Sequence, residues 1–132
     1  IFRRAVFLYK YMLKKQFRLK NKAAFNAIYR LKNSTHIGGV TLFAGKEKTD
    51  AETDTRVGFV VSKKTHKRAV KRNRLKRLMR ESYRLLLKSG NLGNSQRYMS
   101  LIFIGSQKAL DKNFAEIQNI INNLINRIWG DK

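Results

Sequence analysis

The sequence lacks two residue types that usually shape a small protein or its chemistry. Its 132 residues include no cysteine and no proline. The absence of cysteine excludes a disulfide framework, a thiolate metal site and a cysteine nucleophile, and it is compatible with a reducing compartment. The absence of proline means that turns must be built from glycine and polar residues alone.

Acidic residues and long apolar runs are also scarce. Eight Asp and Glu face 30 Lys and Arg, which leaves a net charge of +22. Self-repulsion of that size destabilises a compact domain unless a polyanion neutralises it, and a basic domain of this kind favours nucleic acid over an anionic membrane or an acidic protein. No apolar run approaches the ~18 residues that span a bilayer, and cations interrupt residues 1–12 without a cleavage site. The sequence therefore predicts a soluble, cytoplasmic protein with no membrane partner and no small-molecule substrate.

The length favours one domain. A chain of 132 residues buries roughly two-thirds of its unfolded surface and needs no covalent staple. Residues 12–132 are predicted to form that domain. Residues 1–11 mix aromatic and basic side chains without capping or turn chemistry, so they are predicted to be a poorly ordered extension, with Met12 as the natural start.

Apolar spacing predicts three helices and three strands. The helices are expected at 21–31, 67–88 and 113–129, and the strands at 40–44, 57–62 and 98–104. Asn21 is the expected cap of the first helix. The predicted order is α-β-β-α-β-α, which indicates a small α+β domain of the α/β sandwich type, with helices covering a central sheet.

The second helix carries an unusual concentration of positive charge. Twelve basic residues between Lys63 and Lys88 accompany one acid, Glu81. At 100° per residue, a basic ridge lies opposite the apolar stripe. The ridge consists of Asn73, Lys76, Arg77, Arg80 and Arg84, and the stripe includes Leu75, Leu78, Met79 and Leu86. Like charges at these spacings destabilise an isolated helix, so the ridge favours RNA phosphate binding over a merely solvated face.

An aromatic pair on the first helix allows two interpretations. Phe25 and Tyr29 are four residues apart, so their rings lie one above the other on a helix. With Thr41 and Phe43 they would form an aromatic platform on which unpaired bases stack. Alternatively, the two rings pack the core. Spacing alone favours neither interpretation.

No pattern of protein-borne catalysis is present. His36, His66 and the eight carboxylates show neither metal-ligand nor acid-base spacing, and no Ser, His and Asp arrangement stands out. The acidic segment 50–54 lacks the glycine and closing glutamate of a calcium loop, and no glycine-rich turn opens into a helix. The sequence predicts no catalytic residue, no metal site and no cofactor bound by the protein alone.

Three sequence segments resemble the bacterial ribonuclease P protein family. VGFVVSKK at 57–64 and AVKRNRLKRLMRESYR at 69–84 resemble the family signature of RN, a spacer, KR and then RE, and FRLKNKAAFNAIYR at 17–30 is similar to its N-terminal segment. The resemblance covers about residues 13–129. It departs at THKR, residues 65–68, where many members have a shorter turn with glycine, and residues 1–11 have no counterpart.

The resemblance implies a fold and an activity. The fold would hold a central sheet of about four strands and a left-handed β-α-β crossover made by the basic helix, although right-handed crossovers are the general rule. The activity would be that of the protein subunit of an endoribonuclease ribonucleoprotein, which removes the 5′ leader of precursor tRNA. The RNA subunit would perform the chemistry with Mg²⁺, and the protein would bind that RNA and the leader.

The resemblance also implies two sets of site residues. Contacts to the catalytic RNA would come from Lys63, Lys64, Arg68, Lys71, Arg72, Asn73, Arg74, Lys76, Arg77 and Arg80. The leader-binding cleft would be lined by Arg18, Phe25, Tyr29, Thr41 and Phe43.

Two other classes of protein share the composition. A ribosomal or general RNA-binding structural protein would have the same charge and size but would need no leader cleft. A membrane-active or DNA-compacting protein would display a basic amphipathic helix, but here strands and two further apolar-faced helices indicate a folded domain. The density of the signature favours the ribonuclease P interpretation over both.

Overall fold

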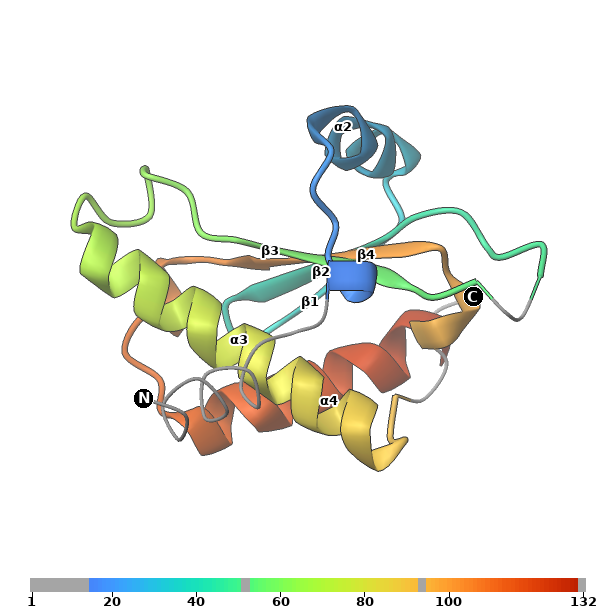
Figure 1. The fold of residues 1–132 in the computed structure, drawn as a ribbon. Helices are drawn as coiled ribbons and strands as arrows, with labels where there is room; N and C mark the ends of the chain where they lie inside the picture. The colour runs from blue at the N-terminus through green and yellow to red at the C-terminus, as the bar shows by residue number, and fades with distance from the viewer. Residues whose placement is uncertain (1–14, 51–52, 93–94, 131–132) are drawn as a thin grey trace, which may run out of the picture.

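The computed structural model describes residues 15–50, 53–92 and 95–130 (Figure 1). The predicted extension at 1–11 lies outside these residues. In chain order the described elements are the short 3-10 turn η1 (Lys15–Phe17), α2 (Lys22–Leu31), β1 (Ser34–Ile37), β2 (Val40–Ala44), β3 (Arg56–Val60), α3 (Ala69–Ser89), the turn η2 (Ser95–Arg97), β4 (Ser100–Gly105), the turn η3 (Gln107–Ala109) and α4 (Phe114–Gly130).

The four strands form one mixed sheet in the order β1-β2-β4-β3. β2 pairs antiparallel with both β1 and β4, whereas β3 pairs parallel with β4. α3 connects those two parallel strands and is therefore the crossover helix. The α+β class with a four-stranded sheet is confirmed. The left hand of the crossover stays a prediction from the resemblance.

Strand β1, Ser34–Ile37, was missing from the order inferred from spacing. It has four residues, and only Thr35 is buried, so it lacks the apolar alternation that indicates a strand. It pairs with β2 through a hairpin at Gly38 and Gly39, whose φ angles are +58° and +92°. A Gly-Gly pair is a known hairpin signal because it tolerates such angles. In this sequence it is the one local feature that indicates the β1–β2 hairpin.

The helices divide between the two faces of the sheet (Figure 1). α3 and α4 cover one face, and there the buried stripe of α3 meets α4 and the inward side chains of the strands. α3 buries Leu75, Met79, Ser82, Tyr83 and Leu86, and Leu78 is half-buried against the core, so the predicted stripe is confirmed with Leu78 at its margin. The contact is close at Gly105, where an added Cβ would lie 2.5 Å from Leu75 Cδ2. This face holds the main core.

Side chains cap the starts of α2 and α4. The amide of Ala23 donates to Asn21 Oδ1 at 2.9 Å, so Asn21 caps α2 as predicted. At the start of α4, the Glu116 amide donates to Asn113 Oδ1 at 2.9 Å and the Asn113 amide donates to Glu116 Oε1 at 3.2 Å. This reciprocal capping box satisfies two amides that have no partner within the helix.

The burial of Tyr83 on α3 can be tested by the pH dependence of the free energy of unfolding. Its ring is 1% exposed, and its hydroxyl accepts a hydrogen bond from Gln96 Nε2 at 3.1 Å. Burial raises the pKa of Tyr83 to about 12, although the Gln96 hydrogen bond opposes that shift. The unfolded chain ionises at a tyrosine's ordinary pKa near 10, so the stabilisation is complete below pH 10 and is lost as the pH rises toward 12.

We expect Tyr83→Phe to remove this part of the alkaline destabilisation. Between pH 10 and 12 the wild-type free energy of unfolding should fall by roughly 2 kcal/mol more than that of the variant. Urea unfolding at a series of alkaline pH values measures both curves. Parallel curves would show that Tyr83 ionises as readily in the folded protein as in the unfolded chain.

Candidate nucleic-acid interface

The basic ridge lies on the side of α3 that the core does not occupy. Its apolar stripe faces the sheet and α4, which leaves the ridge outside. Asn73, Arg77 and Arg80 are exposed, whereas Lys76 and Arg84 are half-buried. The predicted division of the helix into an apolar and a basic face is therefore confirmed, and three polar heads of the ridge are open to a ligand.

The junction between β3 and α3 adds further cations. Lys63, Lys64 and Arg68 are exposed there. The THKR segment folds back on itself: the Arg68 amide donates to His66 Nδ1 at 3.0 Å, and Arg72 Nη1 donates to the His66 and Lys67 carbonyls at 2.6 and 3.0 Å. Arg72 thus braces the loop that precedes its own helix.

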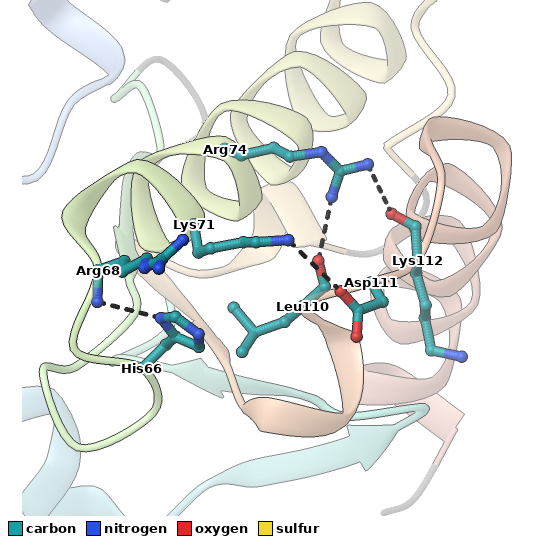
Figure 2. A network of polar contacts seen from close by, with 7 residues as sticks. All are labelled: His66, Arg68, Lys71, Arg74, Leu110, Asp111 and Lys112. Atoms are coloured by element: carbon teal, nitrogen blue, oxygen red, sulfur yellow. Dashed lines mark hydrogen bonds and ion pairs between the residues drawn. The ribbon is translucent and has the colours of Figure 1, made fainter.

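Two other predicted RNA contacts also have partners within the protein (Figure 2). Arg74 is half-buried, and its two terminal nitrogens donate to the carbonyls of Leu110 and Lys112 at 3.0 and 3.3 Å. Lys71 lies beside the turn that precedes α4, with its Nζ 3.9 Å from Asp111 Oδ1. These interactions join residues more than 30 positions apart, and nothing in the local sequence pattern indicated them.

The opposite face of the sheet carries the aromatic platform. Phe25 lies so close to β3 that a Cβ at Gly58 would be 2.5 Å from Phe25 Cζ. The Tyr29 ring meets Phe43 edge to face, with centroids 5.2 Å apart, and partial burial raises the pKa of Tyr29. All four platform residues are half-buried. The packing interpretation therefore holds in part, because Phe25 packs on β3 and Tyr29 on Phe43. Base stacking stays a prediction, for which the half-burial of both residues leaves room.

A row of side chains beside α2 extends this surface across the sheet. The strand register places His36, Thr41, Ile104 and Val60 side by side on the four strands. His36 is exposed and the other three are half-buried, and His36 Nδ1 lies 2.7 Å from Thr41 Oγ1. Sequence reasoning found only Thr41. The other three are brought to it by register, which spacing along one strand does not reveal.

Arg18 links the two surfaces. Its segment joins the sheet, because Arg18 forms a bridge with Val57 and the next amide, Leu19, donates to the Val57 carbonyl at 2.9 Å. Partial burial and then the charge of Arg18 lower the pKa of Arg80. Arg18, a residue of the predicted leader cleft, is thus near enough to Arg80 of the ridge for its charge to affect that group.

Neither a metal site nor a membrane span is found in the described part of the chain. Within residues 15–50, 53–92 and 95–130, no three His, Cys, Asp or Glu side chains gather closely enough to hold a metal ion. None of the helices described there combines the length and apolarity needed to cross a membrane.

The charge, the ridge and the half-open platform define a small basic nucleic-acid-binding protein. Residues 13–129 match the family model described as Ribonuclease P. The chain belongs to the ribonuclease P protein family, which confirms the resemblance found in its sequence. It is thereby a protein subunit of an endoribonuclease ribonucleoprotein that acts with an RNA subunit in 5′ maturation of tRNA.

Relatives and solved structures support this assignment. The chain is 35% identical to the ribonuclease P protein component of Clostridium novyi over 87% of this chain and 96% of the relative. It is 36% identical to that of Symbiobacterium thermophilum over 87% and 93%. A structure of the Staphylococcus aureus RNase P protein superposes with a TM-score of 0.65 at 28% identity, covering 83% and 92%. The RNase P protein from Thermotoga maritima, 24% identical with a TM-score of 0.67 over 83% and 96%, shares the fold.

Proposed function

We propose that the protein binds the catalytic RNA of ribonuclease P through the basic ridge and binds the 5′ leader of precursor tRNA on the aromatic platform. The observation that supports this most directly is the arrangement of the two surfaces. They lie on different elements of one domain, and Arg18 on the platform side is near enough to Arg80 of the ridge for its charge to lower the pKa of Arg80. A protein placed between two RNA molecules needs such a pair of adjoining surfaces.

The ridge suits a folded RNA backbone. Guanidinium groups grip phosphates with two parallel hydrogen bonds, and Arg77 and Arg80 are exposed on the same side of α3. Asn73, also exposed, has both a donor and an acceptor for a base edge or a 2′-hydroxyl. Lys63, Lys64 and Arg68 extend the same positive surface toward the start of the helix.

The platform suits a single strand. Unpaired bases stack on aromatic faces whatever their sequence, and each such contact contributes roughly 1–3 kcal/mol. Phe25 and Tyr29 keep part of their rings open beside Thr41 and Phe43, so a leader strand would run along α2 and over the sheet. Arg18, at the edge nearest the ridge, would meet its phosphates.

The chemistry stays with the RNA in this proposal. Mg²⁺ is expected to be held by the RNA subunit of the assembled enzyme, where it would supply an activated water for phosphodiester cleavage. The protein would supply affinity for the leader and positive charge that lowers the Mg²⁺ concentration needed for assembly. Its own side chains would take no part in bond breaking.

Cleavage of precursor tRNA at low Mg²⁺ tests the proposal. A bacterial ribonuclease P RNA should release the 5′ leader when the protein is present, under conditions in which the RNA alone is nearly inactive. A polylysine of matched charge is the control, because it supplies cations without the fold. Tight RNA binding with no leader release, or equal rescue by polylysine, would instead indicate general RNA binding of the ribosomal-protein kind.

A further inference from the structure

Arg74 is the second arginine of the RNR sequence, and it bonds to the protein itself. Its Nη1 donates to the Leu110 carbonyl at 3.0 Å and its Nη2 donates to the Lys112 carbonyl at 3.3 Å. Figure 2 shows both terminal nitrogens directed at these oxygens. A guanidinium that grips a phosphate in the bidentate mode uses such paired nitrogens. If the two Arg74 nitrogens turned to a phosphate, the carbonyls of Leu110 and Lys112 would lose the hydrogen bonds that Arg74 donates.

The turn that Arg74 holds is fixed at its other end as well. The Ser106 amide and its Oγ both donate to the Gly39 carbonyl at 2.8 Å. Gly39 lies so close to the turn that an added Cβ would be 2.9 Å from the Ala109 nitrogen. Residues 106–112 therefore connect the β1–β2 hairpin to α3. Arg74 is the link on the helix side.

The neighbouring ion pair is a weak substitute for this link. Lys71 Nζ is 3.9 Å from Asp111 Oδ1, and the Asp111 side chain is 92% exposed. An exposed pair at that distance contributes little to stability. The two hydrogen bonds of Arg74 are partly buried and charge-assisted, which makes them the stronger connection.

Because Arg74 and Arg77 are three residues apart, they lie on successive turns of one helix. Fixing the rotation and position of α3 at Arg74 also fixes the direction in which Arg77 and the rest of the ridge point. We propose that Arg74 is a positioning residue, which orients α3 for RNA binding by holding the 110–112 turn and does not itself contact phosphate. This inference rests on the proposed function only in taking the ridge as the RNA-binding surface.

Lysine and glutamine substitutions at two positions distinguish positioning from contact. Arg74→Lys keeps the charge but cannot span two carbonyls with a planar fork. We therefore expect Arg74→Lys and Arg74→Gln to weaken binding to a bacterial ribonuclease P RNA to a similar extent, about tenfold, with the salt dependence unchanged. Arg77, an exposed residue of the ridge, should give a contrasting pattern: Arg77→Lys keeps the charge that a phosphate contact needs and should lose less affinity than Arg77→Gln, which should also reduce the salt slope by about 0.7–0.9.

Amide hydrogen exchange of the free protein tests the link without RNA. The amides of Ala109, Leu110 and Lys112 are hydrogen-bonded within the turn, and they should exchange at least tenfold faster in Arg74→Lys than in wild type. Arg77→Lys should leave them unchanged. Circular dichroism and thermal melting confirm that each variant is folded. If Arg74→Gln does not fold, RNA binding by Arg74→Lys and the exchange rates of its turn amides still test whether Arg74 positions the helix.

Two outcomes would overturn the proposal. If Arg74→Lys binds the RNA with wild-type affinity while Arg74→Gln binds it weakly, the charge at this position is what matters, as in a phosphate contact. Unchanged exchange of the turn in Arg74→Lys would show that the link is dispensable. Failure of the proposed function gives a different pattern, in which Arg77→Gln has no effect on RNA binding while the exchange of the turn still responds to Arg74.

Discussion

Replacing Phe25 by Ala is expected to weaken binding of precursor tRNA to the assembled enzyme by roughly tenfold or more while leaving mature tRNA unaffected. The change removes a base-stacking face, which contributes roughly 1–3 kcal/mol per base. It also removes the ring that packs on Gly58. Because mature tRNA lacks the leader, it makes no use of this surface. Equilibrium binding of the two substrates to the reconstituted holoenzyme measures the difference.

Two further variants show which property of Phe25 matters. Phe25→Leu keeps an apolar side chain against β3 but has no aromatic face, so it should fold normally and still lose affinity for the leader. Leu31→Ala is the control, because Leu31 lies on the same helix, is 45% exposed and does not belong to the platform. Equal losses for precursor and mature tRNA would contradict the assignment of the leader to this surface.

The second large effect is expected from Arg77→Ala combined with Arg80→Ala. Charge-assisted hydrogen bonds contribute roughly 1.5–3 kcal/mol each, so the loss of both guanidinium groups should weaken assembly with the catalytic RNA by more than tenfold. Fewer released counterions should also flatten the salt dependence, by about 0.7–0.9 for each phosphate that the variant no longer neutralises. Filter binding across a salt series gives both quantities.

A pair of lysines controls for net charge in that experiment. Lys46→Ala with Lys88→Ala removes the same charge from two exposed positions outside the ridge. These changes lower the field of the whole protein but remove none of the proposed contacts, so the salt slope should stay near that of wild type. If the arginine and lysine pairs behave alike, RNA binding depends on total charge and the ridge is not a specific face.

Periodic patterns made the helices predictable. The apolar stripe from Leu75 to Leu86 repeats over several turns and admits one helical interpretation, so both the helix and its basic face followed from the sequence. The capping side chain of Asn21 fixed the start of α2 in the same way. The predicted helix begins at residue 67, two residues before the observed start of α3 at Ala69. Arg72 holds the backbone at His66 and Lys67 in a loop by donating to both carbonyls.

Contacts between distant residues were beyond such patterns. β1 is too short to carry a signal of its own and becomes a strand only by pairing with β2. Strand register, not spacing, places His36 beside Thr41 and Ile104. The resemblance grouped Arg74 with the RNA contacts, whereas its guanidinium bonds to carbonyls at 110 and 112. That outcome depends on how the turn before α4 folds against α3.

The sequence by itself determined the charge, the helices, the basic face of α3 and the family, because each of these is written in composition, short-range periodicity or a contiguous signature. Only the tertiary structure decided which cations of that helix stay open to a partner and which hold the protein together. It also showed that the platform lies on the face of the sheet opposite α3 and α4. The physical reason is that hydrogen bonds, burial and register depend on residues that are distant in sequence and become neighbours only in the folded chain.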